Sequence, residues 1–74
     1  MPKRLRRMTA DRLEQLLARH GFVLVAQRGS HRKWRHAEKR LHVIVPRHAG
    51  RILPVGTLLH ILKGAEIPRE EWLS

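Results

Sequence analysis

Three short segments in which apolar and polar side chains alternate follow one another through the middle of the chain. Alternation with a period of two is the pattern of β-strands that are buried on one face. The segments span residues 22–28, 30–36 and 40–45, and they are separated by Gly29-Ser30 and by the polar residues 37–39. Connections this short join antiparallel neighbours, so the pattern predicts a three-stranded antiparallel sheet.

Helix-type periodicity flanks the predicted sheet on both sides. Residues 8–20 have leucines on one face, begin with Thr9 as a good N-cap and end before Gly21. Residues 54–63 start with Pro54, which suits the first helical position. Their apolar stripe consists of Leu58, Ile61, Leu62 and Ala65.

The order of these elements predicts the architecture. A last short turn is expected at residues 68–72, with Trp72 and Leu73 tucked back on the core. Two helices cannot cover both faces of so small a sheet. We therefore expect an α+β fold with the order helix, three-stranded antiparallel sheet, helix, in which both helices lie on one face and the other face is open.

Alternation within residues 30–36 separates Trp34 from His31, Lys33 and Arg35, because neighbouring strand residues point to opposite faces. Trp34 could stack on a base, but burial of so large an apolar side chain is favoured, so its face is predicted to be the core face. The other three side chains then lie on the open face. In residues 22–28 the same alternation groups Phe22, Leu24 and Ala26 on one side and Val23, Val25 and Gln27 on the other.

The chain is strongly basic. Its 74 residues, which we interpret as one domain spanning residues 1–74, contain 16 Lys and Arg against 6 Asp and Glu, for a net charge of +10. Such a charge indicates a polyanionic partner, most commonly nucleic acid, with an anionic membrane surface or an acidic protein as alternatives. Residues 1–7 are predicted to form a mobile basic arm. There is no cysteine and no apolar run near the roughly 20 residues of a membrane span, so we expect a cytoplasmic protein that is not inserted in a membrane.

Several short motifs occur in a characteristic order between residues 8 and 73. They are Gly21-Phe22, Arg28-Gly29-Ser30-His31 followed by Trp34, Val43-Ile44-Val45-Pro46-Arg47-His48, and Gly56-Thr57-Leu58 with Ile61-Leu62-Lys63. In these motifs the chain resembles the HicA (YcfA-like) family, the small mRNA interferase toxins of bacterial type II toxin–antitoxin systems. The resemblance implies a double-stranded-RNA-binding-like fold and an endoribonuclease activity in which His31 is catalytic. It also implies a HicB-type antitoxin that covers the active surface, with the toxin monomeric alone and hetero-oligomeric with its antitoxin.

His31 has the chemistry that RNA cleavage needs. The reaction requires a base to remove the 2′-hydroxyl proton and an acid for the leaving 5′-oxygen, and the unperturbed pKa of histidine, about 6.5, lies near cellular pH. Lys33 and Arg35 would favour the neutral ring and stabilise charge on the phosphate. For an arbitrary histidine, a hydrogen bond to backbone after a turn would be the better interpretation. The second proton-transfer group is left open among His36, His42 and His48, and His48 is favoured because it belongs to a motif, although a packing role is at least as plausible for it.

The predicted RNA-binding residues surround His31 in the sequence or belong to the same motifs. They are Arg28, Gly29, Ser30, Arg32, Lys33, Arg35, Arg47 and His48. Gly29 and Ser30 are expected to shape the turn and to offer backbone donors to a phosphate. The six histidines have no metal-ligand spacing, so we expect neither a metal nor another cofactor.

Two alternative functions fit the same composition. A non-catalytic RNA- or DNA-binding module would use the charge and fold order without cleavage. An adaptor for an acidic protein partner would bind RNA weakly, with little dependence on salt.

Overall fold

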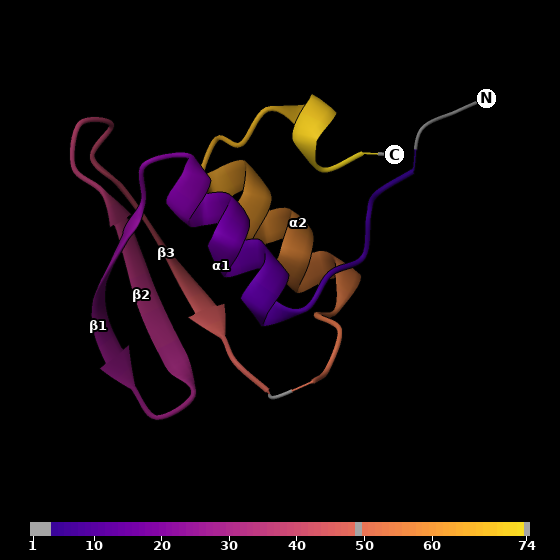
Figure 1. Ribbon diagram of the computed structural model, residues 1–74, viewed down its shortest axis with the longest axis horizontal. Coiled ribbons are helices and arrows are strands. Elements are labelled where there is room, and N and C mark those ends of the chain that lie inside the picture. The colour runs from indigo at the N-terminus through magenta and orange to yellow at the C-terminus, as the bar shows by residue number, and fades with distance from the viewer. Residues whose placement is uncertain (1–3, 49, 74) are drawn as a thin grey trace.

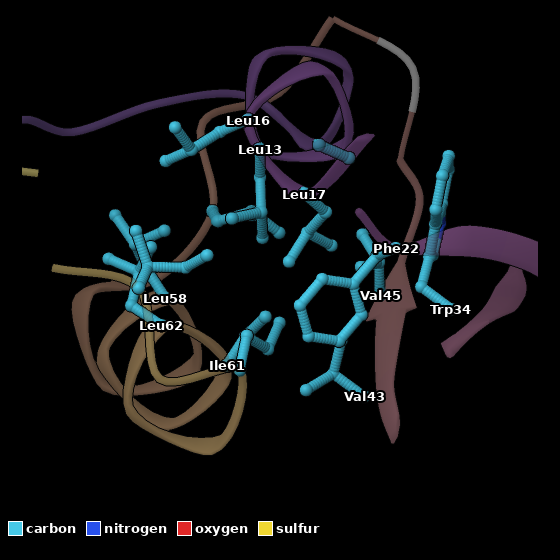
Figure 2. Packing of buried hydrophobic residues seen from close by; sticks show 14 of the residues in the cluster. Leu13, Leu16, Leu17, Phe22, Trp34, Val43, Val45, Leu58, Ile61 and Leu62 are labelled. Atoms are coloured by element: carbon cyan, nitrogen blue, oxygen red, sulfur yellow. The ribbon is translucent and has the colours of Figure 1, made fainter. Parts of the chain in front are cut away.

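The computed structural model describes residues 4–48 and 50–73 of the chain. The elements are α1 (Ala10–Arg19), β1 (Val23–Arg28), β2 (His31–His36), β3 (Leu41–Pro46), α2 (Val55–Gly64) and the short 3₁₀ helix η1 (Arg69–Glu71). The strands form one antiparallel sheet in the order β1-β2-β3. Both helices lie on the same side of this sheet (Figures 1 and 2), which confirms the predicted α+β architecture.

Helix α1 begins and ends at the residues that the sequence indicated. The Thr9 hydroxyl accepts a hydrogen bond of 3.3 Å from the backbone N–H of Arg12, as an N-cap does. After the helix, Gly21 has a φ of +89°, and a Cβ at this position would lie 2.9 Å from Nε2 of His36. Gly21 therefore suits the left-handed backbone conformation, and a larger residue there would also have to displace the ring of His36.

The core lies between the two helices and the sheet (Figure 2). Its most deeply buried large side chains come from α1, α2 and β3, and they are Leu13, Leu17, Leu58, Leu62 and Val45. Trp34 of β2 is buried on the same side, as its apolar ring predicted. Truncation of such a leucine to alanine typically costs about 2–5 kcal/mol, so this layer holds the strands in place.

Strand β1 differs from the prediction in two respects. All six of its residues are exposed, since β1 is an edge strand. Its pairing with β2 shifts between Leu24 and Ala26, so that Leu24 is opposite Trp34, whereas Ala26 is opposite Lys33. Val25 is thus an extra residue, and the side chains after it change faces. The predicted grouping is wrong for Ala26, which is on the open face, and for Gln27, which is on the helix side.

The chain before α1 contacts the C-terminal segment and the loop before α2. The N–H of Arg6 donates to the carbonyl of Trp72 at 2.9 Å, Leu5 pairs with Leu73, and Nη2 of Arg7 donates to the carbonyl of Leu53 at 3.1 Å. Leu5, Arg6 and Arg7 of the expected mobile arm are therefore paired, and residues 1–3 lie outside the described residues. Within the described chain, each helix is too short to cross a bilayer.

The C-terminal segment packs on the core as predicted. The predicted last turn forms η1, and Trp72 is buried, with its indole N–H donating to the carbonyl of Ile67 at 2.9 Å. Helix α2 begins at Val55, so Pro54 is its N-cap rather than its first helical residue.

Candidate active site

The open face of the sheet carries a row of cationic side chains. Central strand β2 places His31, Lys33 and Arg35 on the face away from Trp34, as alternation predicted. Arg28 of β1 is directly opposite His31, which adds a fourth basic side chain on the same face. No helix covers this side of the sheet (Figure 1), and His31, Arg28 and Arg35 are exposed among the described residues.

The position of His31 is set by the turn before it and by the neighbouring strand. Gly29 has a φ of +59°, which lets the chain reverse in two residues. The carbonyl of Ser30 accepts a hydrogen bond of 2.7 Å from the N–H of Arg47, just beyond β3. His31 itself is opposite Pro46 in the ladder with β3. The imidazole is therefore held at one end of the central strand, beside the tight turn.

His31 also lines a groove of about 430 Å³ between the sheet and α2. Ile44 and Pro46 of β3 form the wall beside His31, and the other residues come from one side of α2. Those residues are Gly56, Thr57, His60 and Ile61. The site thus combines an exposed imidazole, a cationic surface and a concave space next to both.

A buried carboxylate organises the opposite side of the sheet. Glu14 of α1 is only 6% exposed. Its oxygens accept hydrogen bonds from Nε of Arg32 at 2.8 Å, from Nη1 of Arg47 at 3.2 Å and from the indole N–H of Trp34. Arg47 also pairs with Asp11. A buried charge needs such partners, because an unpaired one is costly.

Arg32 and Arg47, which we predicted to contact RNA, are therefore not on the open face with His31. Their guanidinium groups are turned toward α1 and paired with carboxylates. Sequence reasoning missed Glu14, although its place beside Leu13 in the buried stripe of α1 was a signal. A carboxylate in an apolar stripe indicates that a basic side chain from another element pairs with it.

The remaining predicted residues are separated by the structure. Gly29 and Ser30 are exposed at the turn, next to His31, whereas His48 is exposed in the loop after β3 and does not line the groove. The structure thus brings Arg28, Gly29, Ser30 and Lys33 close to His31, and Arg35 lies on the same face farther along β2.

None of the three histidines proposed as the second proton-transfer group lines the groove. The ring of His36 packs edge-on against Phe22, with 5.3 Å between centroids, and its Nδ1 accepts a hydrogen bond from the N–H of Lys39. His42 is on the open face but opposite Arg35, four residues along β2 from His31 or about 13 Å away. Among the described residues, His60 is the histidine that shares the groove with His31.

Side chains that could bind a metal are dispersed in this chain. Over residues 4–48 and 50–73, no three histidine, aspartate or glutamate side chains are grouped so that they could hold a metal ion. His20, for instance, pairs with Glu71 at the far end of α1.

Comparison with protein families identifies the chain. Residues 10–67 match the family described as the HicA toxin of bacterial toxin–antitoxin systems. A comparison with curated proteins gave no match. The matched region begins at the first residue of α1, ends just after α2 and includes every residue that lines the groove. Because the match covers most of the 74 residues, the chain belongs to the HicA toxin family and is a toxin of a toxin–antitoxin system.

Proposed function

We propose that this toxin is an endoribonuclease that binds mRNA on the open face of its sheet and cleaves it with His31. The observation that carries the proposal is the exposed imidazole at one end of central strand β2, on the same open face as Arg28, Lys33 and Arg35 and bordering a groove. Family membership supports the same activity.

Binding would depend mainly on phosphate contacts. Arg28, Lys33 and Arg35 follow one another along the open face, so a single strand crossing it could place successive phosphates beside them. The exposed backbone at Gly29 and Ser30 could donate to a phosphate next to His31. These contacts position the RNA and carry no sequence preference by themselves.

Cleavage would proceed by transesterification. His31 removes the proton from the 2′-hydroxyl, and O2′ forms a bond to the adjacent phosphorus while the bond from phosphorus to O5′ breaks. The products are a 2′,3′-cyclic phosphate and a 5′-hydroxyl. Negative charge grows on the phosphate during this step, and Arg28 and Lys33, on the same face as His31, would stabilise it. This route consumes no cofactor.

The partner under this proposal is a HicB-type antitoxin. The net charge of +10 favours an acidic partner, and a protein that covers the open face would keep RNA away from His31. The toxin and antitoxin would then form a hetero-oligomer, from which the free toxin is released as a monomer. Addition of the purified antitoxin should abolish cleavage.

The proposal is tested by incubating purified protein with end-labelled single-stranded RNA. Wild type should degrade the RNA, whereas His31→Ala should bind it equally well without cleaving it. His42→Ala is a matched control, since His42 is exposed on the same face and outside the groove. Equal binding without cleavage by wild type and variant would indicate a non-catalytic RNA-binding module instead. In cells, expression of wild type should arrest growth, and His31→Ala should relieve the arrest.

A further inference from the structure

His31 and His60 reach the same groove from different elements. His31 is the first residue of β2, and His60 lies in the second half of α2, three residues after Thr57. Residues three apart on a helix share a face, and Thr57 and His60 both line the groove. Tertiary packing of α2 beside β3 therefore brings together two imidazoles that are 29 positions apart in the sequence.

We propose that this groove holds the scissile nucleotide and that His60 is the general acid that completes the reaction begun by His31. The inference rests on the proposed ribonuclease function and extends it. It assigns a catalytic role to a residue outside the segment around Gly29-Ser30-His31.

The lining of the groove suits this task. Ile44, Pro46 and Ile61 supply apolar surface for the ribose and its base, and the polar groups are concentrated at His31, Thr57 and His60. No carboxylate is present among the described residues that line it. Since Lys and Arg hold their protons too tightly to release them to O5′ near neutral pH, a histidine is the group there that can serve as the acid.

The first turn of α2 adds a second favourable feature. Its N-cap, Pro54, makes no side-chain hydrogen bond to the turn, and Gly56 and Thr57 line the groove. First-turn N–H groups lack partners within their helix and favour negative charge. In an in-line displacement O2′ and O5′ lie on opposite sides of phosphorus, so a phosphate bound with O2′ beside His31 would have O5′ toward α2, where His60 lines the groove.

The proton balance of the step is complete with these two residues. His31 enters neutral and accepts the proton of the 2′-hydroxyl as the bond from O2′ to phosphorus forms. His60 enters protonated and transfers its proton to O5′ as the bond from phosphorus to O5′ breaks. After product release, His31 loses its extra proton to water and His60 regains one, so no other reactant is required. The charged side chains of the sheet near the pair are Arg28 and Lys33, with Arg35 farther along β2, and His42 adds a titratable group near His60.

The test uses a substrate whose leaving group needs no acid. The cleavage site is first mapped on a mixed-sequence RNA, and two oligonucleotides with this site are then made, one natural and one with sulfur in place of the bridging O5′. A thiolate leaves without protonation, so general-acid catalysis is dispensable on the sulfur substrate. His60→Ala and His60→Gln should slow cleavage of natural RNA by about 10²–10³-fold and should cleave the sulfur substrate at nearly the wild-type rate.

Two controls make the result specific. His31→Ala should be impaired on both substrates, because attack by O2′ still needs a base. His42→Ala should behave as wild type on both. His60 is exposed, so His60→Ala and His60→Gln should both keep the wild-type circular dichroism spectrum and melting temperature.

The outcomes separate this inference from the proposed function. If wild type cleaves RNA through His31 but the His60 variants cleave natural RNA at the wild-type rate, His60 is not the acid and the ribonuclease function stands. Equal slowing on natural and sulfur substrates would also overturn the acid role, since a structural defect affects both. If wild type cleaves neither substrate, the ribonuclease function fails, and the role of His60 fails with it.

Discussion

The two faces of β2 carry similar side chains and use them in opposite ways. On the open face, His31, Lys33 and Arg35 have no helix above them (Figure 1). On the helix side, Arg32 pairs with Glu14 and His36 packs against Phe22. A basic side chain in this protein is therefore structural where a carboxylate or an aromatic ring meets it, and it is available for a ligand where nothing covers it.

This difference shows how a chain with 16 Lys and Arg can remain ordered around so few carboxylates. Asp11 and Glu14 are concentrated at α1, where they neutralise Arg32 and Arg47 beneath the sheet. The uncompensated charge is left on the surface that faces solvent. Repulsion there is screened by water and salt, whereas inside the fold it would not be.

The largest expected effect is the difference between alanine substitutions at the two histidines of β2, His31 and His36. His31→Ala should lower RNA cleavage by about 10²–10⁴-fold with the melting temperature unchanged, because the ring is exposed and catalytic in our proposal. His36→Ala should keep cleavage but lower the melting temperature, because it removes the contact with Phe22 and the acceptor for the N–H of Lys39. Cleavage rates and thermal melts of both variants check this, and a reversed pattern would contradict the assignment of the faces.

Glu14→Gln should have the next largest effect, on stability. It leaves the charge of Arg32 uncompensated in a partly buried site and leaves Arg47 paired with Asp11 alone, and breaking a buried pair typically costs about 3–5 kcal/mol. Urea unfolding of the variant measures the loss. Glu38→Gln, in the exposed hairpin loop, is the matched control and should change the free energy of unfolding by less than about 0.5 kcal/mol. Equal stability of the two variants would show that the Glu14 cluster is not structural.

Alanine substitutions at Gly21, near His36, and at Gly29, in the turn before His31, should differ by a smaller amount in their free energies of unfolding. Gly21→Ala meets both a φ of +89° and the ring of His36, and we expect a loss of about 2 kcal/mol. Gly29→Ala has only a φ of +59° to accommodate, since no described atom lies within 4 Å of an added Cβ, so about 1 kcal/mol is expected. Urea unfolding measures the free energy lost by each variant. A larger loss for Gly29→Ala than for Gly21→Ala would contradict the close contact between Gly21 and His36.

The smallest expected effect concerns salt dependence. Lys33→Ala should reduce the slope of log K for single-stranded RNA against log salt by about 0.7, the value for one phosphate contact. Arg32→Ala should leave the slope unchanged, because its guanidinium is paired with Glu14. Binding titrations at several salt concentrations check the pair, and an equal change in both slopes would mean that Arg32 also reaches the RNA.

The success of the face assignment depended on regular pairing. Trp34 marked the core side of β2, and β2 pairs with β3 without interruption, so His31 was correctly placed on the open face. In β1 the same reasoning failed for Ala26 and Gln27, because one extra residue at Val25 reverses the alternation. A bulge of this kind depends on the partner strand, and the local pattern carries no clear sign of it.

The candidate site was predictable only in part for a related reason. His31 was found because its own strand and motif pointed to it. His60 was missed because its relation to His31 depends on the packing of α2 beside β3. We predicted that Arg32 and Arg47 bind RNA because the sequence shows their charge. The sequence did not show that buried Glu14 pairs with both of them.

Periodicity and turn residues in the sequence determined the helices, the strands, the face on which His31 lies and the excess of positive charge, because these depend on neighbours within a few positions. Which basic groups are neutralised, and which second histidine stands across from His31, was decided only in the tertiary structure. Those properties depend on contacts between residues far apart in the chain, such as Glu14 with Arg47 and α2 with β3, and such contacts form only when the helices pack on the sheet.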